Sequence, residues 1–238
     1  MNTAICFTGT GREIEHTFDN LRENVIDPFD NRDVIVYITD TPKAKETEKY
    51  FQTLDNVYIH VVKEEPVDIY KYNFLNNWPP QPETKSISLE QSRQIYIQML
   101  KSRSYMNKLI DQRETKYDRV IFSRMDGIYE KPIRESIDKL DLSKLWLPHF
   151  HHWTGGYNDR FAVSSRENMH HYFSLGDYID SYAEVQHTLC AETTLKFHLD
   201  NNNMDIGIFK LYFSRFRNGK LHETFEKLDT QAVVPCDI

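Results

Sequence analysis

The sequence has few cysteines, no long hydrophobic run and no excess of basic charge. Each of these absences argues against one class of protein. Cys6, Cys190 and Cys236 are the three cysteines among 238 residues, and they are widely separated without metal-binding spacing. We therefore expect neither a disulfide scaffold nor a cysteine-based metal site, and the odd count favours a reducing compartment. Cytoplasm is the expected location.

Hydrophobic residues are not concentrated in any single long segment. No stretch approaches the ~20 apolar residues that a membrane span requires. The start of the chain, MNTAICFTGTGRE, lacks the basic and apolar regions of a signal peptide. We therefore expect no membrane span and no anchor. The length of 238 residues is enough for one sizeable α/β domain or two small ones.

The charge balance argues against a protein that coats nucleic acid. The formal net charge is −7, and the lysines and arginines form no concentrated basic face. Contact with many phosphates requires such a face, so we expect no nucleic-acid partner, while local basic pockets fit the composition. The 14 tyrosines and 14 phenylalanines suit a cleft that stacks a base or a sugar, and they suit core packing equally well.

Strand and helix patterns alternate in the first quarter of the chain. The strand patterns are TAICF (residues 3–7), DVIVYIT (33–39) and NVYIHVV (56–62). Apolar residues recur at helical spacing from Ile14 to Val25, and the polar helix KAKETEKYFQTL follows the second strand. This βαβαβ order predicts an α/β fold with a mostly parallel, doubly wound sheet flanked by helices.

The remainder of the chain continues this pattern after an irregular segment, residues 63–86, which we interpret as a substrate-side loop. A long amphipathic helix is expected from Ser88, and a further helix is expected in AETTLKFHL. Ser164 and Glu167 have the spacing of a capping box. Without a break in composition, we predict a single domain over 1–238, with a nucleotide-binding half at about 1–130 and an acceptor-side half at about 131–238.

The first strand is followed by a glycine-containing turn that suits phosphate binding. Its residues are Thr8, Gly9, Thr10, Gly11 and Arg12. Only G-x-G is present, so the dinucleotide fingerprint is incomplete, and such a pair is about as often just a tight β-α turn. Backbone N–H groups and the Arg12 side chain at the start of a helix nevertheless suit a diphosphate.

Asp126 follows the strand pattern RVIFSR, at the edge where open α/β sheets bind ligands. Two interpretations compete: a ligand of a divalent cation that bridges two phosphates, or an Asp-Gly turn. One protein carboxylate suffices for the first, because the diphosphate and water supply the other ligands. Arg124 points to the same side of the strand and suits direct neutralisation of phosphate.

Other polar residues cluster later in the chain. The three histidines of PHFHHW suit sugar or phosphate contacts, or a surface position, better than a zinc site. Asp159 lies beside Arg160 on a turn after paired glycines, which allow close approach to a ligand. Glu192 starts a helix, where a carboxylate also simply complements the helix dipole.

Taken in order, these motifs resemble the GT-A-fold glycosyltransferases of the small cytosolic type, as found in bacterial surface-polysaccharide clusters and large DNA viruses. The resembling segments are AICFTGTGR, DVIVYIT, YDRVIFSRMDGIY, GGYNDRFAVSSRENM and AETTLKFHL. The resemblance implies a single Rossmann-like domain that transfers a hexosyl or deoxyhexosyl group. The implied donor is a nucleotide-diphosphate sugar, with a UDP-sugar favoured, and the acceptor is a glycan or another hydroxyl compound.

The same resemblance implies Mn²⁺ or Mg²⁺ bound at an Asp-x-Asp motif. Arg124 stands in the first acidic position, so Asp126 alone corresponds to the metal and diphosphate carboxylate. Thr8 to Arg12 correspond to the loop that contacts the nucleotide. Asp159 and Glu192 correspond to acidic positions that face donor sugar and acceptor, with Glu192 favoured as the base if the reaction inverts; a retaining reaction needs no such base.

Two alternative functions are compatible with the same predicted sheet. The missing first aspartate motivates an inactive protein that only binds nucleotide sugars. A sugar nucleotidyltransferase shares the sheet and the metal carboxylates, but TGTGREIEH is a poor match to the basic glycine-rich loop that such enzymes need. Release of nucleoside diphosphate from a donor separates a transferase from an inactive binder.

Overall fold

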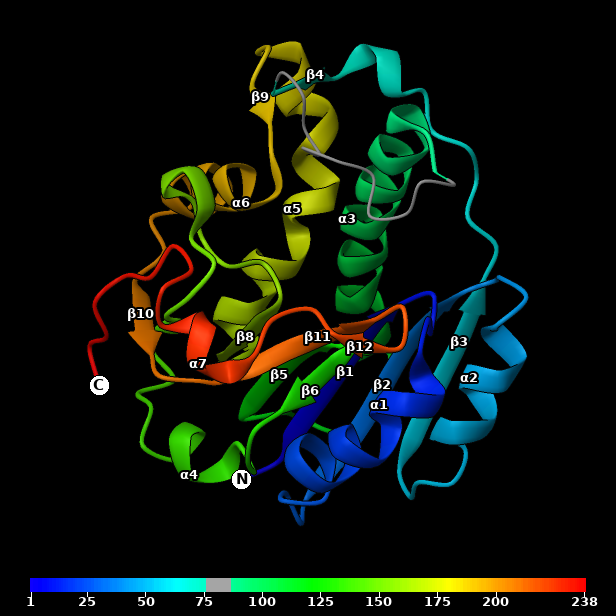
Figure 1. Cartoon of the computed structure of the whole chain (residues 1–238), viewed down its shortest axis with the longest axis vertical. Coiled ribbons are helices and arrows are strands. Elements are labelled where there is room, and N and C mark those ends of the chain that lie inside the picture. The colour runs from blue at the N-terminus through cyan, green and yellow to red at the C-terminus, as the bar shows by residue number, and fades with distance from the viewer. Residues whose placement is uncertain (76–86) are drawn as a thin grey trace.

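The computed structural model describes residues 1–75 and 87–238 (Figure 1). Its strands are β1 (Thr3–Gly9), β2 (Arg32–Thr39), β3 (Val57–Val62), β4 (Asn73–Phe74), β5 (Arg119–Arg124), β6 (Gly127–Tyr129), β7 (Leu145–Pro148), β8 (Phe161–Ser164), β9 (Thr188–Leu189), β10 (Ile206–Phe209), β11 (Phe213–Arg217) and β12 (Lys220–Leu221). Its α-helices are α1 (Ile14–Leu21), α2 (Ala44–Phe51), α3 (Leu89–Asp111), α4 (Arg134–Ile137), α5 (Arg166–Glu184), α6 (Ala191–Asn201) and α7 (Phe225–Leu228). A π-helical turn, η1 (Arg22–Ile26), extends α1, and η2 (Ile69–Lys71) and η3 (Trp153–Gly155) are short 3₁₀ turns. The expected substrate-side loop, residues 63–86, lies partly outside the described residues, and its role stays a prediction.

The central sheet has seven strands in the order β10-β7-β8-β5-β1-β2-β3. Strands β3, β2, β1 and β5 are mutually parallel, β8 runs antiparallel to both β5 and β7, and β10 is parallel to β7. This confirms the expected mostly parallel α/β sheet. The chain adds β2 and β3 on one side of β1 and then returns to add β5 on the other, so the strand order reverses between β1 and β5.

Helices cover both faces of this sheet (Figure 1). Ala4 and Cys6 of β1 belong to the core formed with α3 and α5, whereas Ile5 and Phe7 belong to the core formed with α1 and α2. Successive side chains of a strand point to opposite faces, so a strand covered on both faces is apolar throughout. Complete burial of a side chain such as Phe7 contributes about 1.5–3 kcal/mol.

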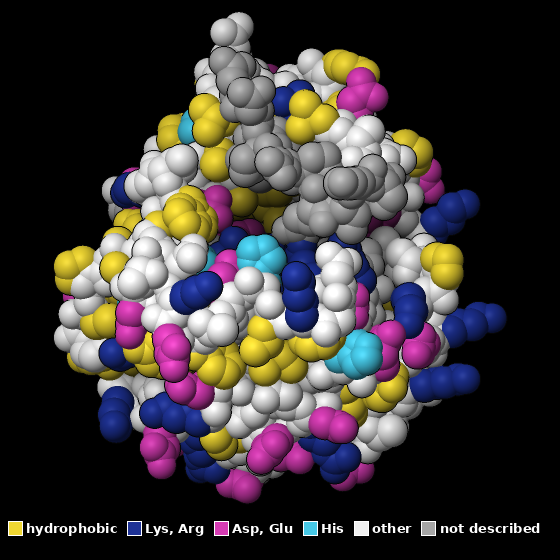
Figure 2. Space-filling model, in the orientation of Figure 1, with side chains coloured by type: hydrophobic (Ala, Val, Ile, Leu, Met, Phe, Trp, Pro, Cys, Tyr) yellow, Lys and Arg dark blue, Asp and Glu magenta, His cyan; other side chains and the backbone are white. Residues whose placement is uncertain are grey.

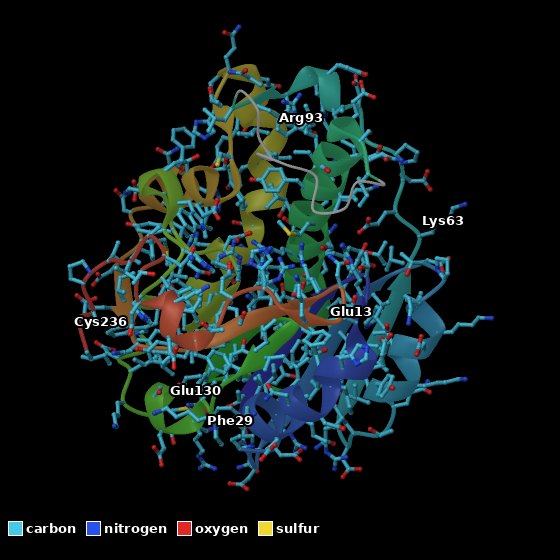
Figure 3. The ribbon with its side chains drawn as sticks, viewed as in Figure 1. Glu13, Phe29, Lys63, Arg93, Glu130 and Cys236 are labelled. Atoms are coloured by element: carbon cyan, nitrogen blue, oxygen red, sulfur yellow. The ribbon has the colours of Figure 1, made fainter. Side chains whose placement is uncertain are left out.

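A smaller sheet, in the order β12-β11-β6, joins the C-terminal part of the chain to the end of β5. The ring of Phe213 on β11 stacks on Tyr129 of β6, with centroids 5.0 Å apart. At the turn of the β11–β12 hairpin, the N–H of Asn218 donates to Oε1 of Glu13 (3.1 Å). Figure 3 shows Glu13 near this hairpin, while Glu130 lies toward the lower end of the molecule. The hairpin therefore reaches the loop after β1.

The predicted start of α5 is wrong by one residue. Ser165, and not Ser164, caps the helix, because its hydroxyl accepts from the N–H of Asn168 (3.3 Å). Ser164 ends β8 and is fully buried, and its hydroxyl donates to the carbonyl of Lys144 (2.7 Å). The capping box of Ser164 and Glu167 is therefore not formed. Because Ser164 and Ser165 are adjacent, the sequence alone does not show which of them caps the helix.

The other long helices begin where the sequence predicts. The Ser88 hydroxyl accepts from the N–H of Gln91 (3.1 Å), and the Gln91 side chain accepts from the N–H of Ser88 (2.8 Å), so a capping box starts α3. The helix expected in AETTLKFHL is α6. None of the helices in the described ranges is long and apolar enough to cross a membrane.

Candidate functional site

Both candidate ligand loops begin where β1 and β5 end side by side. Thr8 on β1 pairs in register with Arg124 on β5. The strand order reverses at this pair, which is the position where open α/β sheets bind ligands. The loop after β1 and the Arg124–Asp126 segment therefore lie together at the edge of the sheet that the sequence predicts to be functional.

The loop after β1 is held in place by α2. Gly11 has a φ of +65°, and a Cβ atom there would lie 1.7 Å from Oγ1 of Thr47, so only glycine fits. The Thr47 hydroxyl donates to the carbonyl of Gly11 (3.4 Å). Gly9 also has a positive φ, of 146°. The tight β-α turn is thus present, it carries Arg12 at its end, and its contact with a nucleotide stays a prediction.

Asp126 is buried and surrounded by arginines. Nε and Nη2 of Arg124 donate to its two carboxylate oxygens at 2.7 and 2.8 Å. Nε and Nη2 of Arg217 both donate to Oδ2 at 3.2 Å. Burial opposes ionisation of Asp126, but the charges of Arg124, Arg215 and Arg12 outweigh it and hold its pKa below the ordinary value. Asp126 is therefore a carboxylate with guanidinium groups on both oxygens.

This arrangement does not fit a divalent cation at Asp126. Oδ1 accepts one charge-assisted hydrogen bond and Oδ2 accepts three, so a metal ion would have to compete with the guanidinium groups. A cation at that position would also repel Arg124 and Arg217. No group of three or more His, Cys, Asp or Glu side chains suited to a metal ion occurs in residues 1–75 and 87–238. The prediction of Mn²⁺ or Mg²⁺ at Asp126 stays untested.

Asp159 lies in the same region and is ion-paired from α3. Nη2 of Arg103 donates to its Oδ2 at 3.1 Å, and both side chains are buried. Burial opposes its ionisation, but the charges of Arg103, Arg160 and Arg124 hold the pKa of Asp159 below its usual range. The turn is fixed by Asn158, whose Oδ1 accepts from the N–H of Arg160 (2.8 Å). Asp159 is thus committed to an internal ion pair.

Glu192 lies beside this pair at the start of α6 and is 6% exposed. Nη2 of Arg160 lies 3.7 Å from its Oε1. Burial and the negative charge of Asp159 raise the pKa of Glu192 to about 7, against the opposing charge of Arg160. Gly156 packs against the backbone of Glu192. A Cβ atom at position 156 would lie 2.2 Å from the carbonyl carbon of Glu192. A carboxyl group of this kind changes protonation near neutral pH, as a general base must.

Arg160 connects Glu192 to the C-terminal part of the chain. Its Nη1 contacts Nδ1 of His151, and Nε2 of His151 lies 3.5 Å from Oε1 of Glu223. Burial and the charge of Arg215 lower the pKa of Arg160 to about 10. In Figure 2, basic, acidic and histidine side chains gather at a hollow near the middle of this face. The site therefore combines a strongly basic side with a buried carboxyl group.

The three histidines of PHFHHW do not form one group. They are all buried, so the alternative of a surface position is wrong. Nε2 of His149 lies 3.0 Å from Oδ1 of Asp229, and the ring of His152 contacts the carbonyl of Pro148 (2.7 Å). Of the three, His151 contacts Arg160 of the candidate site.

The sequence prediction missed Arg103, Arg215 and Arg217. Arg103 lies on the buried side of α3, where a single basic residue in an amphipathic helix gives no signal of its own. Arg215 and Arg217 alternate on β11, so their side chains share one face of the strand. That alternation in SRFR was the available signal, but nothing local in the sequence places the strand beside β5.

The likeness to known structures shows the fold. A family model described as "Domain of unknown function (DUF7796)" matches residues 1–217. No curated protein sequence matches the chain. One similar solved structure is the apo-form glycosyltransferase GlyE of Streptococcus pneumoniae TIGR4, at 13% identity and a TM-score of 0.50, with 87% of this chain and 45% of GlyE covered.

A second similar structure is the galactosyltransferase LgtC in complex with donor and acceptor sugar analogs. Its identity is 11% and its TM-score is 0.50, with 86% of this chain and 73% of LgtC covered. The chain thus spans less than half the length of GlyE and about three quarters of LgtC. The fold is the GT-A-like fold of these glycosyltransferases, which confirms the fold expected from the sequence.

Proposed function

We propose that this chain, which belongs to the DUF7796 family, is a glycosyltransferase that moves a sugar from a nucleotide-diphosphate sugar to a hydroxyl acceptor such as a glycan. Fold alone does not carry this proposal, because one fold hosts many functions. The observation that supports it is the pairing, at the β1–β5 edge, of a basic region around Arg124 with the buried carboxyl group of Glu192. An inverting transfer from a diphosphate uses both.

The basic region suits the donor. In the proposed complex, the loop from Thr8 to Arg12 contacts the nucleotide, and Arg12 and Arg124 neutralise the diphosphate. The in-register pair of Thr8 and Arg124 brings the two segments to one edge of the sheet, which supports a shared ligand. Positive groups aimed at the departing diphosphate stabilise the charge that develops there during transfer.

Glu192 suits the acceptor step of an inverting reaction. The acceptor hydroxyl oxygen bonds to the anomeric carbon, the bond from that carbon to the diphosphate oxygen breaks, and its electron pair leaves with the diphosphate. The hydroxyl proton passes to the carboxylate of Glu192. Asp159 is the less suitable base because Arg103 binds it at 3.1 Å and its pKa is low. A retaining reaction would not use this proton transfer.

Further features of the proposal follow from the resemblance to small cytosolic glycosyltransferases. They are a UDP-sugar donor, transfer of a hexosyl or deoxyhexosyl group, a single domain and a cytoplasmic location. The Mn²⁺ or Mg²⁺ that the resemblance implies stays a prediction. The second candidate function is an inactive nucleotide-sugar binder, which is favoured by the two arginines that occupy the carboxylate of Asp126.

A donor screen tests the proposal. The purified chain is titrated with UDP-sugars and GDP-sugars, with EDTA and with Mn²⁺, and the release of nucleoside diphosphate is followed over hours. A transferase binds a donor and releases nucleoside diphosphate slowly to water, and Glu192→Gln reduces that release. Binding without release in the wild type identifies the inactive binder. A folded sample that binds no donor under either condition contradicts the proposal.

A further inference from the structure

The turn η3 presents the indole ring of Trp153 to solvent. Trp153 is 40% exposed, whereas Trp146 on β7 is 4% exposed and its indole N–H donates to the carbonyl of Asp141 (2.7 Å). Among the described residues, a Cβ atom at Gly155 would meet no heavy atom beyond its chain neighbours within 4 Å, so the space beside the turn is open. A single exposed apolar side chain is ordinary on a protein surface. The support and the position of this ring therefore decide whether it has a role.

A buried histidine of the candidate site supports the indole ring. The ring of His151 stacks on that of Trp153, with the centroids 5.7 Å and the planes 22° apart. His151 is 2% exposed, its backbone N–H donates to the carbonyl of Gln231 (2.8 Å), and its side chain contacts Arg160. Burial and the charge of Arg160 hold the pKa of His151 well below its usual range, so the ring behind the indole carries no charge at neutral pH.

The backbone on both sides of Trp153 is fixed in an unfavourable conformation. The φ angles of His151 and Thr154 are +60° and +55°, in the left-handed region that residues other than glycine seldom adopt. Such residues persist only where the surrounding structure enforces their conformation. The indole ring is therefore held in one place before any ligand arrives, and this reduces the entropy that binding costs.

The same turn is joined to the start of α6, which carries Glu192 (Figure 1). The N–H of Gly156 donates to the carbonyl of Trp153 (3.0 Å), and the N–H of Tyr157 donates to the carbonyl of Glu192 (2.9 Å). A turn closed by a hydrogen bond between residues i and i+3 keeps their Cα atoms within about 7 Å of each other. Because Gly156 packs against the backbone of Glu192, Trp153 and the proposed base lie within the length of a short oligosaccharide.

An aromatic ring in this place suits a carbohydrate. One face of a pyranose ring carries C–H groups that bury apolar surface against a flat indole, while its hydroxyl groups stay available for hydrogen bonds. A nucleotide base also stacks on aromatic rings, but the proposed nucleotide loop follows β1, whereas Trp153 follows β7. The sheet order β7-β8-β5-β1 separates them by three strand spacings of about 4.8 Å, which is roughly 14 Å. The position of Trp153 therefore favours the acceptor over the base.

We propose that Trp153 binds the acceptor, and that the acceptor is a carbohydrate whose pyranose ring stacks on the exposed indole ring. This inference rests on the proposed function, because it directs a hydroxyl group of the bound sugar to Glu192. It narrows the acceptor from any hydroxyl compound to a glycan. Trp153 takes no part in the proton transfer, but it sets the affinity for the acceptor and holds the sugar where Glu192 accepts the proton.

Saturation-transfer difference NMR tests this binding without any turnover. The probes are methyl β-D-glucopyranoside, methyl β-D-galactopyranoside, methyl α-D-mannopyranoside and N-acetylglucosamine, each added to the wild-type chain with and without UDP. At least one probe should receive saturation. Trp153→Ala should weaken its affinity about tenfold, because the stacking surface is removed, whereas Trp153→Phe keeps a flat ring and should retain the binding. No transfer to any probe, or equal affinity in Trp153→Ala, overturns the inference.

A second exposed aromatic side chain provides the control. Tyr178 is 47% exposed on α5 and is not among the residues of the candidate site, so Tyr178→Ala should bind the probes as the wild type does. Circular dichroism and thermal melts verify that each variant is folded. Titration with UDP should give the same affinity for the wild type and Trp153→Ala. A weaker affinity for UDP in Trp153→Ala would mean that the indole stacks on a nucleotide base, and it overturns the inference.

Failure of this inference and failure of the proposed function give different results. In a transferase that uses one of these sugars, Trp153→Ala should raise the acceptor KM about tenfold, with little change in kcat or in donor release to water. Transfer with an equal acceptor KM in both proteins leaves the glycosyltransferase intact and overturns the role of Trp153. Sugar binding that needs Trp153, with no release of nucleoside diphosphate from any donor, supports the carbohydrate site and contradicts the transferase.

Discussion

Asp126 and Glu192 are two carboxyl groups at one edge of the sheet, and they lie in opposite surroundings. Their exposed fractions are similar, 8% and 6%, so burial opposes ionisation of both. Arginines on both oxygens hold the pKa of Asp126 low, whereas Asp159 helps to raise the pKa of Glu192 to about 7. Neighbouring charge, and not burial, therefore distinguishes the two groups. Such a separation is how one site holds a fixed anion and a proton acceptor together.

Removal of the proton acceptor should have the largest effect. Glu192→Gln keeps the size of the side chain but cannot take a proton, so release of nucleoside diphosphate from a bound nucleotide sugar should fall about 10²–10⁴-fold. Donor affinity should change little, because the basic region is untouched. Steady-state release assays and donor titration measure the two quantities. Glu184→Gln, at the exposed end of α5, is the control, and equal rates for both variants would exclude Glu192 as the base.

Loss of the buried ion pair between Arg103 and Asp159 should mainly affect stability. Arg103→Met leaves the carboxylate of Asp159 buried without its 3.1 Å partner. Breaking a buried pair costs about 3–5 kcal/mol, so the free energy of unfolding in urea should fall by roughly that amount. Arg22→Met breaks an exposed pair and should cost less than about 1 kcal/mol. A loss no larger than in this control would show that Arg103 is not needed to compensate Asp159.

The pH dependence of stability should have opposite signs in the two regions. The pKa of Glu192 in the folded protein, about 7, lies above its ordinary 4.5, so its contribution is fully present below pH 4.5 and is lost as the pH rises to about 7. The loss is up to about 3 kcal/mol. The pKa of Asp126 is lowered from 3.8, so its contribution is present above that pH and is lost as the pH falls below it.

Urea denaturation between pH 3 and pH 8 measures how the free energy of unfolding changes with pH on the acid side and in the neutral range. Glu192→Gln should flatten the decline in unfolding free energy between pH 4.5 and pH 7, and it should leave the acid side of the curve unchanged. Asp126→Asn should change the acid side alone. A Glu192→Gln curve parallel to the wild type across the neutral range would show that Glu192 has an ordinary pKa.

The smallest effect is expected at the contact between the β11–β12 hairpin and the loop after β1. Glu13→Ala removes the acceptor of the Asn218 N–H (3.1 Å), which should lower the free energy of unfolding by about 0.5–1.5 kcal/mol. The Glu192 step should be unaffected. Glu23→Ala, at an exposed glutamate nearby, serves for comparison. Equal stability of both variants would mean that the contact is not stabilising.

The sheet was predictable because its signals are local. The strands β1 and β2 are nearly continuous apolar runs with an amphipathic helix between them, and a strand covered on both faces must have such a composition. The position of Asp126 followed from the same rule, since ligand loops follow the carboxyl ends of parallel strands. The predicted start of α5 was wrong because Ser164 and Ser165 have equivalent hydroxyl groups. Packing alone decides which of them caps the helix.

The partners of the predicted site residues were not predictable, because they come from distant segments. Arg217 is 91 residues from Asp126 in the sequence, and Arg103 is 56 residues from Asp159. Sequence patterns report which side of an element is buried, but they do not report which buried charges face one another. The position of Asp126 at the end of its strand, with Arg124 beside it, was therefore predictable, whereas its neighbours Arg215 and Arg217 were not.

The link between Asp126 and β11 also determines when the site can assemble during protein synthesis. The N–H of Phe216 donates to the carbonyl of Asp126 (2.8 Å), and the side chain of Arg217 binds its carboxylate. Ribosomes add about 5–20 residues per second, so the 91 residues between Asp126 and Arg217 take several seconds to appear. A nascent chain can pair β1, β2, β3 and β5 in that interval, but its Asp126 lacks Arg215 and Arg217. The complete surroundings of Asp126 therefore form late in synthesis.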